Sequence, residues 1–373
     1  MRPRARAVLA CLVAVGALAS PAAAQRFRDP DDGKFDLSQH LAGASGFLPI
    51  PIIITEPAVG YGGGLLAAYF HGSIEEWSQR AGRFRPPSIS VAGGFYTENG
   101  SWGVVAGHYG VWAGDRVRYL GALGYVSPNL AVYPAVLDGE PLDFNLRGVI
   151  LVQQAKVRVA GDFFAGARYL YGGNTFEFDL DTTLAGVEPR EQDVATGGLS
   201  FMLELDARDN VLSPKRGTRV QVTGAFYGTA LGGDSTYQQV NLLAHQYVRP
   251  WRWLDVALRV DATASTDGAP FYARPFLRLR GLPALQYQGQ QVALGEAELR
   301  VPIGARWSVV GFGGVGFTDN GREELLHETS TVGTGGAGFR YLLARRLGLQ
   351  AGVDIAFGPD DPAIYLQVGH AWF

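Results

Sequence analysis

Apolar and polar residues alternate with a period of two along most of the chain. Residues 296–301 read Glu-Ala-Glu-Leu-Arg-Val, so three ionisable side chains point to one face of a strand and three apolar ones to the other. Residues 254–261 show the same alternation. A soluble sandwich puts its polar face in water, whereas a membrane barrel puts it in the lumen. Charges of both signs recur so regularly on this face that the pattern favours a wet lumen.

Glycines and prolines separate the alternating runs, which predicts an all-β fold of many strands. We expect a transmembrane antiparallel β-barrel of the outer-membrane type with about sixteen strands, an even number as in bacterial single-chain barrels. The predicted strands are 48–55, 58–72, 88–97, 101–112, 116–126, 144–160, 163–178, 195–209, 217–231, 237–251, 253–266, 292–303, 307–319, 330–344, 346–358 and 363–373.

The links between these strands alternate in length. The links predicted to be tight are 113–115, 161–162, 251–252, 304–306 and 345, and those predicted to be long are 127–143, 179–194, 267–291 and 320–329. Short turns at one end and long loops at the other are typical of outer-membrane barrels, whose turns face the periplasm. The short link at 56–57 and the longer one at 73–87 are exceptions.

The first 24 residues have the features of a cleaved export signal. Arg2, Arg4 and Arg6 precede an apolar run at 7–19, and three alanines end the segment. The apolar run is shorter than the roughly 20 residues needed to span a bilayer as a helix. We therefore expect export to the outer membrane.

The expected domain organisation has three parts. Residues 1–24 are a signal peptide, residues 25–47 a periplasmic tail or plug, and residues 48–373 the barrel. The middle part is too short to fold alone, because domains need roughly 40 residues or more.

Composition excludes some partners. Cys11 is the only cysteine, so cleavage leaves a chain without disulfides. Loss of the three leader arginines changes the formal net charge from −3 to −6. Nucleic-acid binders need a basic face, so we expect no nucleic-acid partner.

Three stretches resemble signature sequences of the BamA/TamA superfamily of outer-membrane barrels, which includes two-partner-secretion transporters and the bacterial surface antigen domain. They are a Leu-Arg-Gly-Leu loop at 279–282, an Arg-Asp…Pro-x-x-Gly turn at 208–217 and the closing strand at 363–373. The resemblance covers nearly all of the expected mature chain. We expect a barrel-only branch without POTRA domains.

The loop motif implies a latch in the lumen. In the family this loop folds back into the barrel, and its arginine pairs with carboxylates of the wall, which places Arg280 and Gly281 inside. The strand at 310–316 lacks the aspartate that commonly receives the arginine, so Glu298 is the expected partner and Glu296 a second candidate. A guanidinium can bind carboxylates through several parallel hydrogen bonds. The alternative is an exposed loop arginine.

The turn motif maps onto Arg208, Asp209, Pro214 and Gly217, which the resemblance implies to lie on the periplasmic side.

The chain ends in a strand with a terminal aromatic residue. Gly369, Trp372 and Phe373 resemble the signal that the barrel-assembly machinery reads during insertion. The aromatic residues also fit an interfacial girdle.

These features lead to one functional hypothesis and two alternatives. The resemblance implies that the protein assists insertion or translocation of unfolded outer-membrane or secreted proteins. The mechanism would be a lateral seam between the first and last strands, which the Arg280 latch keeps in register. The alternatives are a passive or gated pore, in which the loop narrows the lumen, and a structural surface antigen. Expected partners are outer-membrane lipid, such protein clients and the barrel-assembly machinery.

Other candidate chemistry is weaker, and we expect no cofactor, no metal and no enzymatic activity. Gly-x-Gly-x-x-Gly occurs at 311–316 and 333–338, but no helical pattern follows, so we interpret both as strand positions without side chains. His327 and Ser330 lack the surroundings of a hydrolase site. Four loop aspartates could bind calcium but are better explained as solvated turns: Asp179, Asp181, Asp360 and Asp361.

Overall fold

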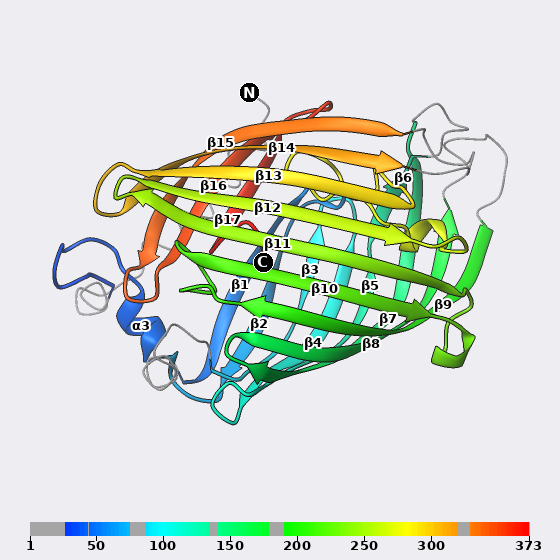
Figure 1. The fold of residues 1–373 in the computed structure, drawn as a ribbon, viewed down its shortest axis with the longest axis horizontal. Coiled ribbons are helices and arrows are strands. Elements are labelled where there is room, and N and C mark those ends of the chain that lie inside the picture. The colour runs from blue at the N-terminus through cyan, green and yellow to red at the C-terminus, as the bar shows by residue number, and fades with distance from the viewer. Residues whose placement is uncertain are drawn as a thin grey trace.

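The computed structural model describes residues 27–43, 45–74, 87–133, 140–178, 190–319 and 329–372. Within these residues the chain forms one barrel of antiparallel strands (Figure 1). The predicted leader, Asp179, Asp181, His327 and Phe373 lie outside the described residues.

Sixteen strands make up the wall, as the sequence predicts. They are β1 (Gly46–Glu56), β2 (Gly60–Phe70), β3 (Ile89–Thr97), β4 (Trp102–Trp112), β5 (Val117–Ser127), β7 (Leu142–Ala160), β8 (Phe163–Phe178), β9 (Arg190–Asp206), β10 (Gly217–Tyr227), β11 (Tyr237–Trp251), β12 (Leu254–Ser265), β13 (Gln291–Pro302), β14 (Trp307–Asp319), β15 (Ser330–Ala344), β16 (Leu349–Phe357) and β17 (Ala363–Val368). The remaining strand, β6 (Asn129–Val132), pairs only with the start of β7.

Each wall strand pairs antiparallel with the next one along the chain, and β5 pairs directly with β7. We call the end of the barrel with the links 113–116, 161–162, 252–253 and 303–306 the turn end, and the opposite end the loop end.

In residues 27–43, 45–74, 87–133, 140–178, 190–319 and 329–372, helical structure is limited to three short elements. The elements are α3 (Ser38–Ala42), η2 (Thr229–Leu231) and η3 (Phe271–Ala273). In the described parts of the chain, no helix has the length and apolar character required to cross a membrane.

Three strands depart most from their predicted bounds. β9 begins at Arg190, five residues early, because its ladder with β8 continues to the pair Phe178 and Arg190 through polar residues that hide the alternation. β10 ends at Tyr227 because the chain turns into η2. The predicted closing strand 363–373 is wrong in its last part: β17 ends at Val368.

The alternation predicted from the sequence is confirmed. On β13, Glu296, Glu298 and Arg300 are buried in the lumen, whereas Leu299 on the other face is exposed. Outward aromatic side chains gather in two belts, as expected at membrane interfaces. The turn-end belt contains Phe47, Tyr69, Trp112, Phe163, Trp251, Trp253, Trp307 and Phe339, and the loop-end belt contains Tyr61, Tyr96, Trp102, Tyr125, Phe226, Phe317 and Phe357.

Candidate functional site

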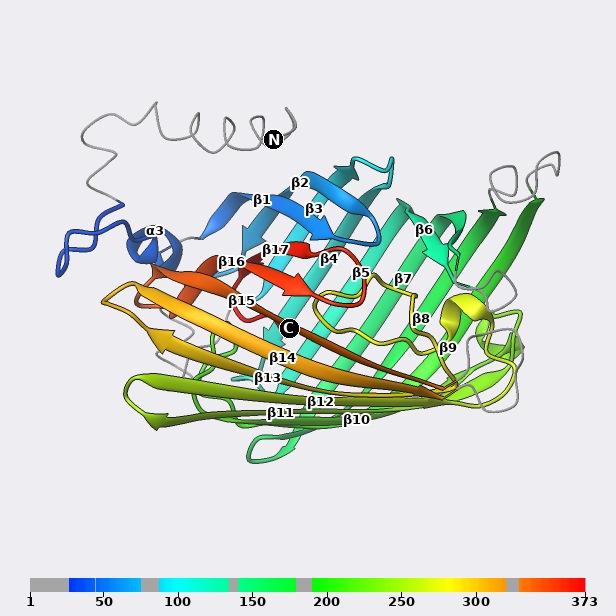
Figure 2. The same ribbon diagram turned by 90° about the horizontal axis from the view of Figure 1, so that it is seen from above.

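The link between β12 and β13, residues 266–290, folds into the barrel (Figure 2). Its two arms are joined by backbone hydrogen bonds. Leu277 N–H donates to the Tyr287 carbonyl at 2.9 Å, and Gly289 N–H donates to the Pro275 carbonyl at 3.0 Å. These bonds keep the loop narrow enough to lie within the lumen. We call residues 266–290 the inner loop.

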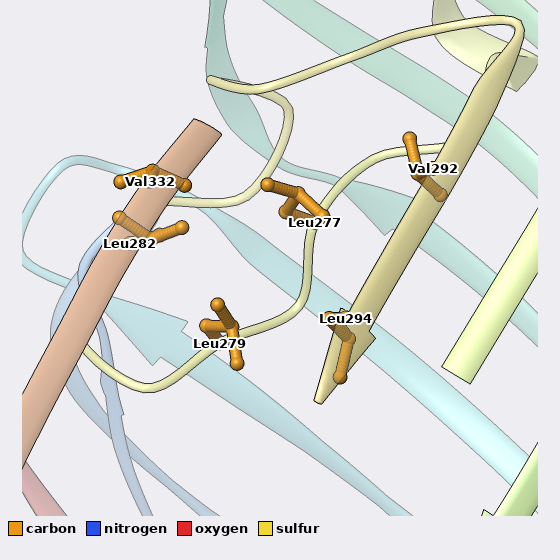
Figure 3. Close-up of a cluster of buried hydrophobic side chains, with 6 residues drawn as sticks. All are labelled: Leu277, Leu279, Leu282, Val292, Leu294 and Val332. Carbon is orange, nitrogen blue, oxygen red and sulfur yellow. The ribbon is translucent and has the colours of Figure 1, made fainter. Parts of the chain in front are cut away.

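Leucines hold the inner loop against the wall. Because each is almost fully buried, and burying a leucine stabilises by about 1.5–3 kcal/mol, their packing is worth several kcal/mol. The cluster consists of Leu277, Leu279 and Leu282 from the loop, Val292 and Leu294 from β13 and Val332 from β15 (Figure 3).

Glycines on β14 make room for these leucines. A Cβ atom on Gly316 would lie 2.5 Å from Leu277 Cδ1, and one on Gly314 would lie 2.8 Å from Leu279 Cδ2. The run at 311–316 is therefore part of a strand, as we interpreted it. The close approach of the loop is the physical reason for Gly314 and Gly316 in this run.

Arg280 lies at the tip of the inner loop, and the structure brings it together with Glu296 and Glu298. Nε donates to Glu296 Oε1 at 2.8 Å, and Nη1 donates to Glu298 Oε2 at 2.9 Å. Burial by itself would lower the pKa of Arg280, but the neighbouring carboxylates raise it above its usual value. Arg280 is therefore charged and ion-paired, and it is not exposed.

The sequence did not identify two further partners of Arg280. Nη1 also donates to Asp354 Oδ2 at 2.9 Å, and the guanidinium lies 3.6 Å above the centre of the Phe312 ring. Asp354 is fully buried and also binds Arg340 from β15. It is the only acidic residue of β16, and the alternation of the strand places it on the lumen face. These two features of the sequence could have identified it as a partner of Arg280.

Gly281 fixes the tip in a second way. Its N–H donates to the Tyr365 hydroxyl at 2.9 Å, and its φ of +97° is a conformation that favours glycine. Tyr365 lies on β17, so the inner loop contacts the last strand directly.

The last residues turn into the lumen. Gly369 has a φ of +84°, and after it His370 and Trp372 are buried against Tyr247 on β11. The girdle position expected for Trp372 is therefore wrong. Burial lowers the pKa of His370 to about 3, against the opposing effect of Glu298 at 3.8 Å, so its imidazole is neutral at pH 7. The insertion-signal role of Gly369, Trp372 and Phe373 stays a prediction.

The seam between β1 and β17 is weakly joined. Leu366 N–H donates to Thr55 Oγ1 at 3.2 Å, and the described residues contain no backbone ladder between the two strands. β17 is six residues long and β1 eleven. Since Thr55 is near the loop end of β1 and only two residues of β17 follow Leu366, the first half of β1 extends past the end of β17.

The predicted turn motif lies at the turn end between β9 and β10. Asp209 Oδ1 accepts the Lys215 N–H at 3.0 Å, Pro214 is buried, and Gly217 has a φ of +108°. A side chain on Gly217 would also meet the Ala207 carbonyl at 2.2 Å. These contacts give the turn a fixed shape.

This turn is tied to distant parts of the rim. Arg208 donates to Asp206 at 2.8 Å, and Asp206 also accepts from Arg118 of β5 at 3.2 Å. Asn210 Nδ2 donates to the Leu347 carbonyl in the β15–β16 turn at 2.8 Å. The turn therefore reaches across the turn end of the barrel.

Residues 27–43 dock on the same rim through a buried arginine. Arg306 in the β13–β14 turn is 2% exposed and binds Asp29 at 2.5 Å, Asp32 at 2.6 Å and also Asp36. The hydrogen bond from Arg306 lowers the pKa of Asp32 to about 2. Arg345 in the β15–β16 turn binds Asp29 at 2.7 Å. We call residues 27–43 the N-terminal segment.

The apolar side of the N-terminal segment bridges the seam at the turn end. Leu37 and Leu41 pack against one apolar cluster that contains Phe70 of β2 on one side of the seam and, on the other, Ala344 at the end of β15 and Leu347 in the β15–β16 turn. Leu37 N–H also donates to the Leu343 carbonyl at 2.8 Å.

A cavity of about 940 Å³ remains in the lumen between these parts. Its lining comes from β8 to β13, the seam strands β1 and β17, the inner loop and the C-terminal tail, and it contains arginines, amides and a few acids.

Comparison with solved structures places this arrangement among known barrels. The chain superposes on BamA from Haemophilus ducreyi lacking POTRA domains 1–3, with a TM-score of 0.58 and 11% identity over 87% of this chain and 69% of that one. It has the fold of the BamA/TamA-like outer-membrane barrels. No protein-family model matches the sequence, and neither does any curated protein.

Two CdiB structures share this BamA/TamA-like fold. CdiB from Escherichia coli has a TM-score of 0.57 and 9% identity, and CdiB from Acinetobacter baumannii has 0.58 and 8%. Each covers 86% of this chain, which spans only 61% and 59% of theirs. The structural similarity establishes the fold of this chain and does not establish its activity.

The remaining predicted sites are dispersed over this barrel. The glycine run at 333–338 lies on β15, and Ser330 begins that strand. Asp360 accepts a hydrogen bond from Gln286 of the inner loop at 2.6 Å, which explains it without an ion. Over the residues that the structure describes, no cluster of His, Cys, Asp or Glu is placed to hold a metal.

Proposed function

We propose that this barrel assists insertion or translocation of proteins at the outer membrane, through a seam between β1 and β17 that opens laterally. The observation that carries the proposal is the seam itself. It has one side-chain hydrogen bond where neighbouring wall strands have continuous ladders. Opening the wall at a seam with few hydrogen bonds costs less free energy than opening it within a continuous ladder.

The inner loop is the proposed latch of this seam. Arg280 binds Glu296 and Glu298 on β13 and also Asp354 on β16, while Gly281 binds Tyr365 on β17. A loop that contacts both β13 and the closing strand can hold the seam-side strands in place. Its displacement would free them to move.

The clients would be unfolded outer-membrane or secreted proteins, which the family resemblance implies. An exposed strand edge pairs readily with another chain, so an opened β1 offers a template for an incoming strand. The protein itself would be placed in outer-membrane lipid by the barrel-assembly machinery.

A passive pore is the weaker alternative. The inner loop and the C-terminal tail occupy the lumen, and the β9–β10 turn crosses its turn end. These contacts favour a closed lumen over an open channel.

The test is reconstitution of the mature chain in liposomes, with the folding of a second, urea-unfolded barrel protein timed against empty liposomes. The proposal predicts faster folding than in empty liposomes and loss of this acceleration in Arg280→Ala. The acceleration should be unchanged in Arg278→Ala, because Arg278 is an exposed residue of the same loop. No acceleration by the wild-type protein, together with steady single-channel current, would replace this proposal with the pore.

A further inference from the structure

We propose that the lumen cavity binds a small molecule through an anionic oxygen group, a carboxylate or a phosphate. The proposal is independent of the insertion role. The cavity volume of about 940 Å³ lies within the usual range of small-molecule sites.

The lining of the cavity carries more basic than acidic side chains. Its ionisable residues comprise five arginines, Arg168, Arg219, Arg259, Arg278 and Arg280, against three acids, Glu56, Asp261 and Glu296. The lining is therefore basic although the whole chain carries a net charge of −3.

Two of the three acids of the cavity are already engaged. Glu296 binds Arg280, and Asp261 binds Arg259 at 3.0 Å. Arg219 is paired with Glu204 outside the cavity at 3.3 Å. Within the described residues, Arg168 and Arg278 have no acidic partner and Glu56 has no cationic one. Two unpaired arginines against one unpaired carboxylate leave an excess of positive charge.

The position of this charge strengthens its effect. Two arginines, Arg219 on β10 and Arg259 on β12, lie directly opposite His245 of β11, one on each side of it. A recess with low-dielectric walls focuses the field of such charges and concentrates counter-ions. Unpaired charge in a partly buried recess is unfavourable unless an opposite charge binds there.

Two buried ring nitrogens of the lining lack partners. Trp372 Nε1 carries a proton and has no acceptor. The Tyr247 hydroxyl lies 3.4 Å from His245 Nδ1, and if it donates there, the proton of His245 is on Nε2, which also has no partner. Both residues are at least nine-tenths buried and line the cavity, so they add neutral donors beside the arginines.

The experiment is calorimetric titration of the full mature chain in non-ionic detergent at low salt. Citrate is the carboxylate probe and inorganic pyrophosphate the phosphate probe. We expect saturable binding of at least one of them at one site per chain. Binding of citrate alone assigns a carboxylate ligand, and binding of pyrophosphate alone assigns a phosphate ligand.

Two arginines can be removed without leaving a carboxylate unpaired. Arg168→Gln and Arg278→Gln are each expected to weaken binding at least threefold and together at least tenfold. Arg252→Gln, in the exposed β11–β12 turn, is the matched control and is expected to bind as the wild type does. Absence of saturable binding to the wild type, or binding that the double variant leaves within threefold, would overturn the proposal.

Discussion

Arg280 donates a hydrogen bond to Asp354 at 2.9 Å, although 74 positions separate the two residues in the sequence. Asp354 is on β16, three strands around the wall from the Glu298 partner on β13. β16 also pairs with β17, the last strand of the wall. One guanidinium therefore links the inner loop to the part of the wall that borders the seam.

Replacing Arg280 by alanine should loosen both the loop and the wall. Glu296, Glu298 and Asp354 would each lose a buried cationic partner, and breaking a buried ion pair costs about 3–5 kcal/mol. We expect a lower urea midpoint and faster amide hydrogen exchange at 275–290. The urea midpoint of Arg280→Lys should lie between those of the wild type and Arg280→Ala, because an ammonium group cannot form the same forked hydrogen bonds.

Arg278→Ala is the control for this change, since Arg278 is exposed on the same loop and has no acidic partner among the described residues. Equal effects of the two alanine variants would contradict the latch.

A glycine behind Asp354 provides an independent test. A Cβ atom on Gly338 would lie 2.0 Å from Asp354 Oδ1 and 2.3 Å from the Val353 carbonyl, whereas one on Gly311 would have nothing within 4 Å. Gly338→Ala should therefore displace Asp354 and destabilise by about 1–3 kcal/mol, the usual cost of overpacking. Gly311→Ala should leave the urea midpoint nearly unchanged. The same midpoint in both variants would show that Asp354 is not held as described.

Acid should release the N-terminal segment from the rim. The folded-state pKa of Asp32 is about 2, below its ordinary 3.8, because Arg306 binds the carboxylate. A lowered pKa contributes stability that is complete above the ordinary value and lost as the pH falls through the folded value. We expect detachment between pH of about 4 and 2, reported by an environment-sensitive dye on Lys34→Cys.

Arg306→Gln should give the detached signal already at pH 7, because it removes the common partner of Asp29, Asp32 and Asp36. Asp31→Asn is the matched control, since that carboxylate is largely exposed and pairs with Arg345 instead of Arg306. A dye signal that stays constant to pH 2, and is the same in Arg306→Gln, would refute the docking.

The strands were predictable because their signal is local. Side-chain parity follows from strand geometry alone, so Glu296, Glu298 and Arg300 could be assigned to one face without any knowledge of their neighbours. The contact of Arg280 with the wall was implied by the resemblance of its loop motif to the family's loop, with Glu298 as the expected partner and Glu296 as a second candidate.

The missed features depend on contacts between distant residues. Arg280 reaches Asp354 only because the closed wall brings β16 close to the inner loop. Three aspartates, Asp29, Asp32 and Asp36, bind Arg306 only once the β13–β14 turn is in place. Residues 363–373 continue the alternation, so the sequence predicted one strand. The turn at Gly369 is favoured by the buried contact of Trp372 with Tyr247, which no local pattern encodes.

The position of Trp372 can be read from fluorescence. Single-tryptophan variants that keep Trp112, Trp251 or Trp372 should differ when the protein is reconstituted with brominated lipid. We expect strong quenching for the two outward residues, which are about half exposed, and little for Trp372 in the lumen. Quenching of Trp372 equal to that of Trp112 would show that Trp372 faces lipid, and would contradict its position in the lumen.

The central claim is that the seam must open for the barrel to act, and a reversible lock tests it most directly. Thr55→Cys with Leu366→Cys places a disulfide at the hydrogen bond between β1 and β17, in a protein expressed from Gln25, which has no other cysteine. The control pair, Ala106→Cys with Leu123→Cys, joins β4 and β5 inside a continuous ladder. The folding of a second barrel protein is timed in liposomes that contain each variant. Oxidation should abolish the acceleration of this folding only in the seam pair, and reduction should restore it. Undiminished acceleration with the seam fully oxidised would contradict the account.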